Sequence, residues 1–216
     1  MSYILNNPDV ILRLTGQHLF MVGSSLILAT LLALPLGLLL FRYKKVAPVV
    51  LGLLGIIYTI PSIAMLILLI PLFGLNRTTV IAALVLYTQI ILVRNILAGL
   101  EGVPPATLEA GTGMGMSGWQ RWWRVQLPLA LPVILAGVRV AAVVATAIAT
   151  IGAKFGAGGL GTLLFDGIAQ NRYDKIVTGS LVVAALALAL NYLIMGLENY
   201  FDTGQRIARA ERRRAA

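Results

Sequence analysis

The stretch LFMVGSSLILATLLALPLGLLLF, residues 19–41, runs for 23 residues without a charged side chain. A helix of about 20 apolar residues crosses the roughly 30 Å hydrocarbon core of a bilayer. Further apolar stretches follow near residues 46–73, 79–100, 129–151 and 176–197. Their length suits helices, and they lack the period-two alternation of a membrane barrel. The sequence therefore predicts an all-α integral membrane protein with about five transmembrane helices.

The composition of the whole chain also favours a membrane protein. Of its 216 residues, 59% are hydrophobic and 12% are charged. Soluble domains are nearer 45–50% apolar and about a quarter charged. The net charge is +9, but the basic residues form short clusters between apolar stretches, which fits membrane topology better than nucleic-acid binding. The absence of cysteine excludes disulfides, thiolate metal sites and a cysteine nucleophile.

The distribution of Lys and Arg predicts how the chain is oriented. If the N-terminus is outside, ten of the 17 basic residues are cytoplasmic, five are external, and Arg94 and Arg139 fall within apolar stretches. The excess inside favours a cytoplasmic C-terminus. We therefore expect one transmembrane domain over residues 1–200 and a basic cytoplasmic tail over 201–216. Arg94 and Arg139 are expected to snorkel toward the cytoplasmic interface, and the alternative is a functional charge that faces protein or water.

The N-terminal segment, residues 8–18, is too short and too mixed to span a bilayer. Pro8 suits the first turn of a helix. In an interfacial helix, the apolar side chains of Val10, Ile11, Leu14 and Leu19 would face lipid, and Arg13 and Gln17 would face water. The alternative is an unstructured tail. His18 is expected to be a structural residue at the interface.

Prolines and small residues mark two of the apolar stretches. Pro48, Pro61 and Pro71 interrupt residues 46–73. A break at Pro61 frees backbone groups that a pore lining or a packed helix can satisfy, and a simple packing kink is the alternative. In residues 129–151, Ala141, Ala145 and Ala149 recur every four residues, which predicts a close helix interface.

Residues 101–128, EGVPPATLEAGTGMGMSGWQRWWRVQLP, form the cytoplasmic loop. Pro105 suits a helix start, and Glu109 then lies in the first turns, where the helix dipole favours a carboxylate. Gly113 and Gly115 end this helix. A second short helix carries three tryptophans, and Pro128 and Pro132 restart the chain into the next span. The short exposed helix suits docking of a soluble partner, and a turn lying on lipid headgroups is the alternative.

This loop resembles the coupling-loop signature of ABC importer permeases. That signature reads Glu-Ala-Ala, three residues, Gly, nine residues, Ile, one residue, Leu-Pro. The matching residues here are Glu109, Ala110, Gly115, Leu127 and Pro128, with Val125 in place of Ile and Gly111 in place of the second Ala. Glycine costs about 1 kcal/mol in a helix interior relative to alanine. We therefore expect a looser helix, or a closer partner backbone, at Gly111.

More of the chain is similar to permease subunits of osmoprotectant importers, which carry glycine betaine, choline, carnitine and related quaternary amines. The similar stretches are TIPS at 59–62, GMGM at 113–116, LPLALP at 127–132 and GAGGLG at 156–161. The likeness covers roughly residues 17–200.

The resemblance implies the ABC importer permease fold in a bacterial inner membrane, with a non-catalytic role. The implied partners are a pair of ATPase subunits that bind ATP and Mg²⁺, a second permease copy or sister, and an external substrate-binding protein. This chain has no phosphate-binding Gly-x-x-x-x-Gly-Lys-Ser/Thr loop, so no cofactor is expected in it. Residues 109–111, 115, 127 and 128 would couple to the ATPase. The pore or gate candidates are Tyr58, Pro61, Ser62, Tyr87, Phe155, Gly158 and Gly159.

Three other functions make different demands on the sequence. An intramembrane enzyme needs a carboxylate pair, a Ser/His pair or a metal cluster at depth, and the spans have no Asp or Glu in their middles. A self-contained channel or secondary carrier is another alternative, but a carrier often shows inverted repeats and none is visible. An ABC permease for another small solute remains an alternative. The external loop, residues 152–175, is expected to form a gate or a docking surface, with a flexible turn as the alternative.

Overall fold

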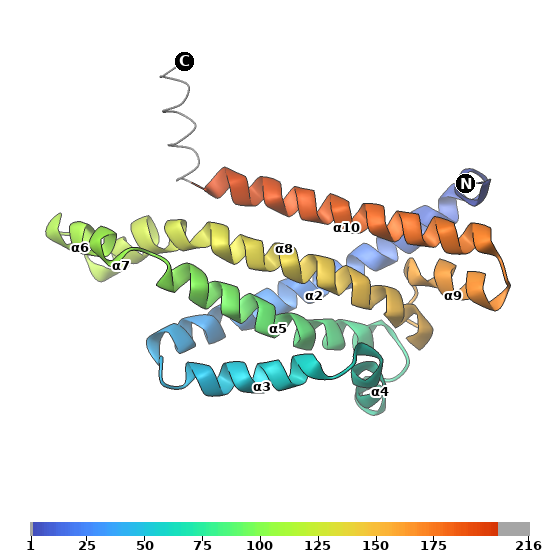
Figure 1. Cartoon of the computed structure of the whole chain (residues 1–216), viewed down its shortest axis with the longest axis horizontal. Helices are drawn as coiled ribbons and strands as arrows, with labels where there is room; N and C mark the ends of the chain where they lie inside the picture. Colours follow the sequence, from blue (N-terminus) through green and yellow to red (C-terminus); the bar gives the residue numbers. More distant parts are fainter. Residues whose placement is uncertain (1, 203–216) are drawn as a thin grey trace, which may run out of the picture.

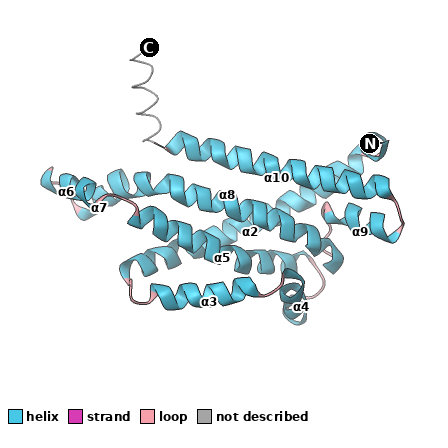
Figure 2. Ribbon diagram, in the orientation of Figure 1, coloured by secondary structure: helices cyan, strands magenta, loops and turns pink. Residues whose placement is uncertain are grey.

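The computed structural model describes residues 2–202, and all regular secondary structure within them is helical (Figure 2). The helices are α1 (Ser2–Asn6), α2 (Pro8–Arg42), α3 (Ala47–Thr59), α4 (Ser62–Phe73), α5 (Arg77–Glu101), α6 (Pro105–Gly113), α7 (Gly118–Arg121), α8 (Leu127–Gly152), α9 (Gly161–Ala169) and α10 (Tyr173–Phe201). A π-helical turn (Trp122–Gln126) joins α7 to α8, and a 3-10 turn (Ala153–Phe155) follows α8. The basic tail predicted at 201–216 lies almost wholly outside the described residues.

Within residues 2–202, four helices are long and apolar enough to cross a bilayer: α2, α5, the continuous helix Gly118–Phe155, and α10. The pair α3 and α4 passes the same test together but bends by 97° at its junction, which makes five spans if the pair is one. This count confirms the prediction of about five. The stretch predicted as a single second span is a sharply bent pair of helices.

The long helices lie side by side, and the connections gather at two ends (Figure 1). The α2–α3 connection, α6, α7 and the end of α10 share one end, called the α6 end below. The N-terminus, α9 and the α4–α5 connection share the opposite α9 end. Helices α2, α5 and α8 pack on one another, and α10 packs on α8.

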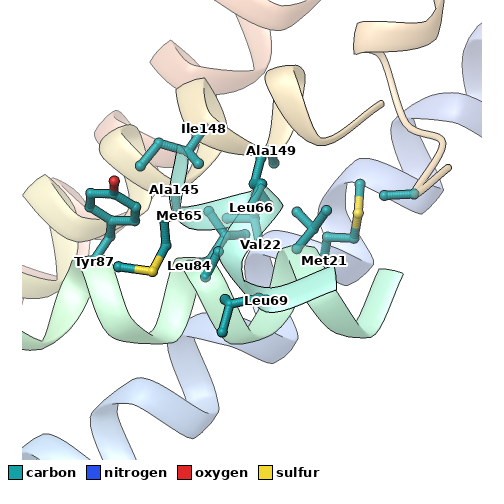
Figure 3. Close-up of a cluster of buried hydrophobic side chains, with 13 residues drawn as sticks. Met21, Val22, Met65, Leu66, Leu69, Leu84, Tyr87, Ala145, Ile148 and Ala149 are labelled. Atoms are coloured by element: carbon teal, nitrogen blue, oxygen red, sulfur yellow. The ribbon is translucent and has the colours of Figure 1, made fainter. Parts of the chain in front are cut away.

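The interior consists mainly of two clusters of buried apolar side chains. The first joins α2, α4, α5 and α8 through residues such as Met21, Met65 and Leu84 (Figure 3). The second joins α2, α5 and α8 closer to the α6 end, through residues such as Leu40 and Ile96. The three alanines of α8 predicted to form a helix interface, at 141, 145 and 149, have no exposed surface. Their small size lets the helix backbones approach closely.

The N-terminal segment is not a separate interfacial helix or an unstructured tail. Helix α2 continues without a break from Pro8 to Arg42, with Pro8 in its first turn as predicted. Leu14, expected to face lipid, is 5% exposed, and His18, expected at the interface, is fully buried. Leu14 packs with Leu160 and Leu163, so the segment between α8 and α10 covers this part of α2.

Candidate functional site

Helix α6 has a sharply defined start and end. Pro105 occupies its first turn, as predicted. At its end, the Gly115 N–H donates to the Thr112 carbonyl at 2.9 Å and the Met116 N–H donates to the Gly111 carbonyl at 3.1 Å. These two bonds form a Schellman motif, which requires a left-handed residue just past the helix. Gly115 has a φ of 77°, so the glycine at this motif position ends the helix.

One face of α6 is exposed and the other is anchored to the bundle. Glu109 and Ala110 are exposed, whereas Gly111 is buried. Leu108, half-buried, packs against the second core cluster, to which Val103 just before α6 also belongs. Helix α6 therefore presents Glu109 outward, while Leu108 joins it to the second core cluster and its main packing partners are α7 and the π-helical turn.

The glycine that departs from the family pattern faces inward. A Cβ at Gly111 would lie 3.5 Å from Met116 Sδ and 3.6 Å from Arg121 Cγ, which are ordinary contact distances. An alanine therefore fits here, and Gly111 is not required by close packing within the chain. Its inward direction also places it away from a partner that would meet Glu109.

The segment after α6 folds back as a second short helix, α7. Ser117 and Gln120 form a capping box at its start. The Arg121 guanidinium donates to the Thr112 hydroxyl, which ties α7 to α6. Trp119 and Trp123 stack edge to face with ring centroids 5.4 Å apart, and both are exposed. The two short helices thus form one compact surface at the α6 end.

The expectation that Pro128 and Pro132 restart the chain is wrong. Helix continues from Gly118 to Phe155, 38 residues. The Leu127 N–H donates to the Trp122 carbonyl across the wider π-helical turn, and Pro128 follows in the first turn of α8. A proline ring clashes with the carbonyl four residues earlier in a regular α-helix. The π turn changes that spacing, so Leu127 and Pro128 connect α7 rigidly to the long helix.

The break between α3 and α4 brings several gate candidates together. The Tyr87 hydroxyl of α5 donates to the Ile60 carbonyl, which the break leaves outside the helical ladder. Tyr58 stacks edge to face on Tyr87 with ring centroids 5.9 Å apart. Pro61 is exposed and Ser62, the first residue of α4, is half-buried. Tyr87 thus satisfies a backbone group that a break within a membrane would otherwise leave unpaired.

The glycine-rich segment, residues 156–161, packs closely against other helices. The Gly159 N–H donates to Gln17 Oε1 at 2.9 Å, and Arg77 Nε donates to the Ala157 carbonyl at 3.1 Å. A Cβ at Gly159 would lie 2.9 Å from Met21 Cε. These contacts fasten the segment to α2 and α5, so the description as a flexible turn does not fit.

Comparison with known proteins identifies the family. Residues 25–207 match the family described as the binding-protein-dependent transport system inner membrane component. The chain belongs to this family. It is therefore a membrane-embedded permease of an ABC transporter and a non-catalytic transport subunit.

Several curated permeases are similar to this one over most of their length. The osmoprotectant import permease protein OsmW of Salmonella typhimurium is 40% identical over 201 residues, covering 91% of this chain and 94% of OsmW. The glycine betaine/carnitine/choline transport system permease protein OpuCB of Bacillus subtilis is 36% identical over 194 residues, covering 90% of this chain and 89% of OpuCB. These matches confirm the resemblance inferred from the loop motifs.

Among solved structures, an inward-facing MetNI methionine ABC transporter matches with a TM-score of 0.77 at 21% identity, covering 89% of this chain and 96% of that chain. An amino acid ABC transporter matches with a TM-score of 0.69 at 19% identity, covering 92% and 95%. At these identities the likeness shows the fold alone, and it confirms the ABC importer permease fold.

The remaining gate candidates of this permease lie in two further places. Phe155 packs against the first core cluster, which also contains Tyr87. Gly158 and Gly159 lie against Gln17 and His18 of α2, not at the α3–α4 break. The structure therefore brings Tyr58, Pro61, Ser62 and Tyr87 together at the break. Phe155 belongs to the same core region as Tyr87, and the two glycines lie elsewhere, against α2.

The structure of the permease adds two polar contacts that sequence reasoning missed. His18 Nε2 lies 3.1 Å from the Thr146 carbonyl, which joins α2 to α8 inside the bundle. Arg139 Nε donates to Glu198 Oε2 at 3.0 Å, so this guanidinium pairs across α8 and α10 and does not depend on snorkelling. The only local signals were a lone histidine and an arginine within an apolar stretch, and neither specifies a partner.

Proposed function

We propose that this permease is the pore-forming subunit of an ATP-driven, binding-protein-dependent importer for quaternary-amine osmoprotectants such as glycine betaine, choline and carnitine. The observation that carries the proposal is the similarity, over about nine tenths of both chains, to permeases named for osmoprotectant and for glycine betaine, carnitine and choline transport. The methionine and amino acid transporters share only the fold, so they contribute nothing to the choice of substrate.

Helix α6 is the proposed coupling helix. Its Glu109 would enter a groove on the ATPase subunit, and its Schellman end at Gly115 would fix the length of the inserted helix. Leu108 and Val103 rest on the core formed by α2, α5 and α8. Because a close-packed core moves as a unit, displacement of α6 would reach the membrane helices as rigid-body motion. The continuous helix through Leu127 and Pro128 gives a second connection from α7 to the bundle.

The partners of the proposed importer supply what this chain does not. A pair of ATPase subunits would bind ATP and Mg²⁺, and a binding protein outside would deliver the solute. A second permease, either a copy of this chain or a sister, would complete the pathway. The exposed apolar side chains of α3 and α10 suit contact with lipid or with that second permease.

In the proposed orientation, the N-terminus is outside and the C-terminus is cytoplasmic. This places the α6 end, with the exposed Arg42, Lys44 and Lys45, in the cytoplasm. The excess of positive charge on that side depends on the five arginines between residues 206 and 214, which lie outside the described residues. An ATPase in the cytoplasm then meets α6, and a binding protein outside meets the α9 end.

The bend between α3 and α4 is the proposed gate. Aromatic faces attract quaternary ammonium groups, and Tyr58 and Tyr87 provide two such rings beside Pro61 and Ser62. Phe155, which packs against the core cluster that contains Tyr87, would also form part of the gate. Gly158 and Gly159 would form part of the external closure, where α2 and the glycine segment are fastened together.

The proposal is tested with permease, ATPase and binding protein reconstituted in vesicles. Glycine betaine uptake is expected to require ATP and all components. Glu109→Gln should lower both co-purification of the ATPase and uptake, whereas Thr107→Ala, an exposed position on the same helix outside the motif, should leave both near wild type. Uptake by the permease alone, or wild-type coupling in Glu109→Gln, would reject the proposed role.

A further inference from the structure

The two arginines that fall within apolar stretches, Arg94 and Arg139, have different surroundings. Arg139 pairs with Glu198 at 3.0 Å, and its Nη1 lies 3.5 Å from Asn191 Oδ1. Arg94 of α5 is exposed and has no hydrogen-bond or ion-pair partner among residues 2–202. A charged side chain within a span usually faces water or protein, because hydrocarbon cannot solvate it. Arg94 therefore needs water or a partner that residues 2–202 do not provide.

Arg94 lies on a stripe of α5 that leads away from the α3–α4 break. Residues at spacings of three and four share one helix face, and this stripe consists of Tyr87, Ile91, Arg94, Ala98 and Glu101. Tyr87 is buried beneath Tyr58 and the break, Ile91 is half-buried, and the last three are exposed. With a rise of 1.5 Å per residue, Arg94 lies about 10 Å from Tyr87 along the helix. The stripe thus continues from the proposed gate to the α6 end.

Direct contact with a second copy is a poor explanation for this exposed charge. Two copies related by a two-fold axis along the membrane normal place equivalent residues at the same depth. If this stripe formed the contact, the two guanidinium groups would approach each other and repel. A water-filled space between the stripes avoids that repulsion and solvates both charges.

We propose that this stripe of α5 is a wall of the water-filled substrate path, and that Arg94 binds the carboxylate of zwitterionic quaternary amines. The inference rests on the proposed importer function and names its preferred substrates. A guanidinium matches the geometry of a carboxylate and binds it with two parallel hydrogen bonds. Glycine betaine and carnitine carry a carboxylate, whereas choline carries only the positive charge, which Arg94 repels.

Accessibility is tested first, in a chain that has no native cysteine. Arg94→Cys and Ala98→Cys are reconstituted with the partner subunits and treated with a charged, membrane-impermeant maleimide. Both are expected to react. Leu193→Cys on α10 is the control that should stay unreacted, because Leu193 is 65% exposed, lies at a comparable position along its helix and would face lipid or the second permease. The proposal is overturned if Arg94→Cys is protected in the assembled complex but reacts after denaturation.

Selectivity is tested by uptake of glycine betaine and of choline into the same vesicles. Arg94→Gln should lower the ratio of betaine to choline uptake by about tenfold or more, the usual effect of losing a hydrogen-bonded charge. Arg94→Lys keeps the charge and should lower the ratio less. An equal loss for both solutes, or a wild-type complex that carries choline alone, contradicts the carboxylate site. A wild-type complex that imports no quaternary amine with ATP instead contradicts the importer function itself.

Discussion

Replacing Gly115 by alanine should disrupt the end of α6, the proposed coupling helix, without changing its exposed face. Gly115 has a φ of 77°, and a Cβ added there would meet no atom within 4 Å, so the cost is conformational and not a clash. A left-handed conformation costs a non-glycine residue roughly 1–2 kcal/mol. If α6 binds the ATPase only with this end formed, that cost weakens the affinity by about 5–30-fold.

The assay is the affinity between purified permease and ATPase, measured together with ATP-driven uptake. Gly115→Asn should retain more affinity than Gly115→Ala, because asparagine tolerates the left-handed region. Gly113→Ala is the matched control: it is exposed, a Cβ added there also meets no atom within 4 Å, and its φ is not positive. Equal affinities for Gly115→Ala, Gly113→Ala and wild type would refute the reasoning.

Three further substitutions have effects that follow from single contacts. Gly111→Ala should be tolerated and should raise the melting temperature, since alanine is favoured by about 1 kcal/mol within a helix and its Cβ fits; a fall in melting temperature would contradict this. Tyr87→Phe should destabilise the fold by about 1–3 kcal/mol in denaturant unfolding, because the Ile60 carbonyl loses its donor; an unchanged midpoint would show that the bond contributes nothing. Glu198→Leu should lower stability by about 1–3 kcal/mol by leaving Arg139 unpaired, and adding Arg139→Leu should recover part of that loss, as a double-mutant cycle would measure.

The local chemistry of α6 was sufficient to predict its ends. Pro105 sets the first turn, and Gly115 accepts the left-handed conformation that a Schellman motif requires. Both effects act within a few residues, so they can be read without tertiary structure. The same locality explains why the break at Pro61 was predictable, whereas its angle of 97° was not.

Other features depend on partners far away in sequence. The polar start of α2 suggested an interfacial segment, but Leu14 and His18 are buried because the segment between α8 and α10 covers Leu14 and α8 covers His18. The Arg139–Glu198 pair joins residues 59 positions apart. The π turn before Pro128 likewise could not be predicted from the motif, whose prolines suggested a restart of the chain.

Photo-crosslinking tests the central claim, that α6 contacts the ATPase, most directly. A photoreactive amino acid is placed at Ala110, on the exposed face of α6, and in a second variant at Tyr173, which is 79% exposed near the α9 end. We predict a crosslink to the ATPase subunit from position 110 and none from position 173. A crosslink from position 173, or none from position 110 in a complex that transports, would contradict the account.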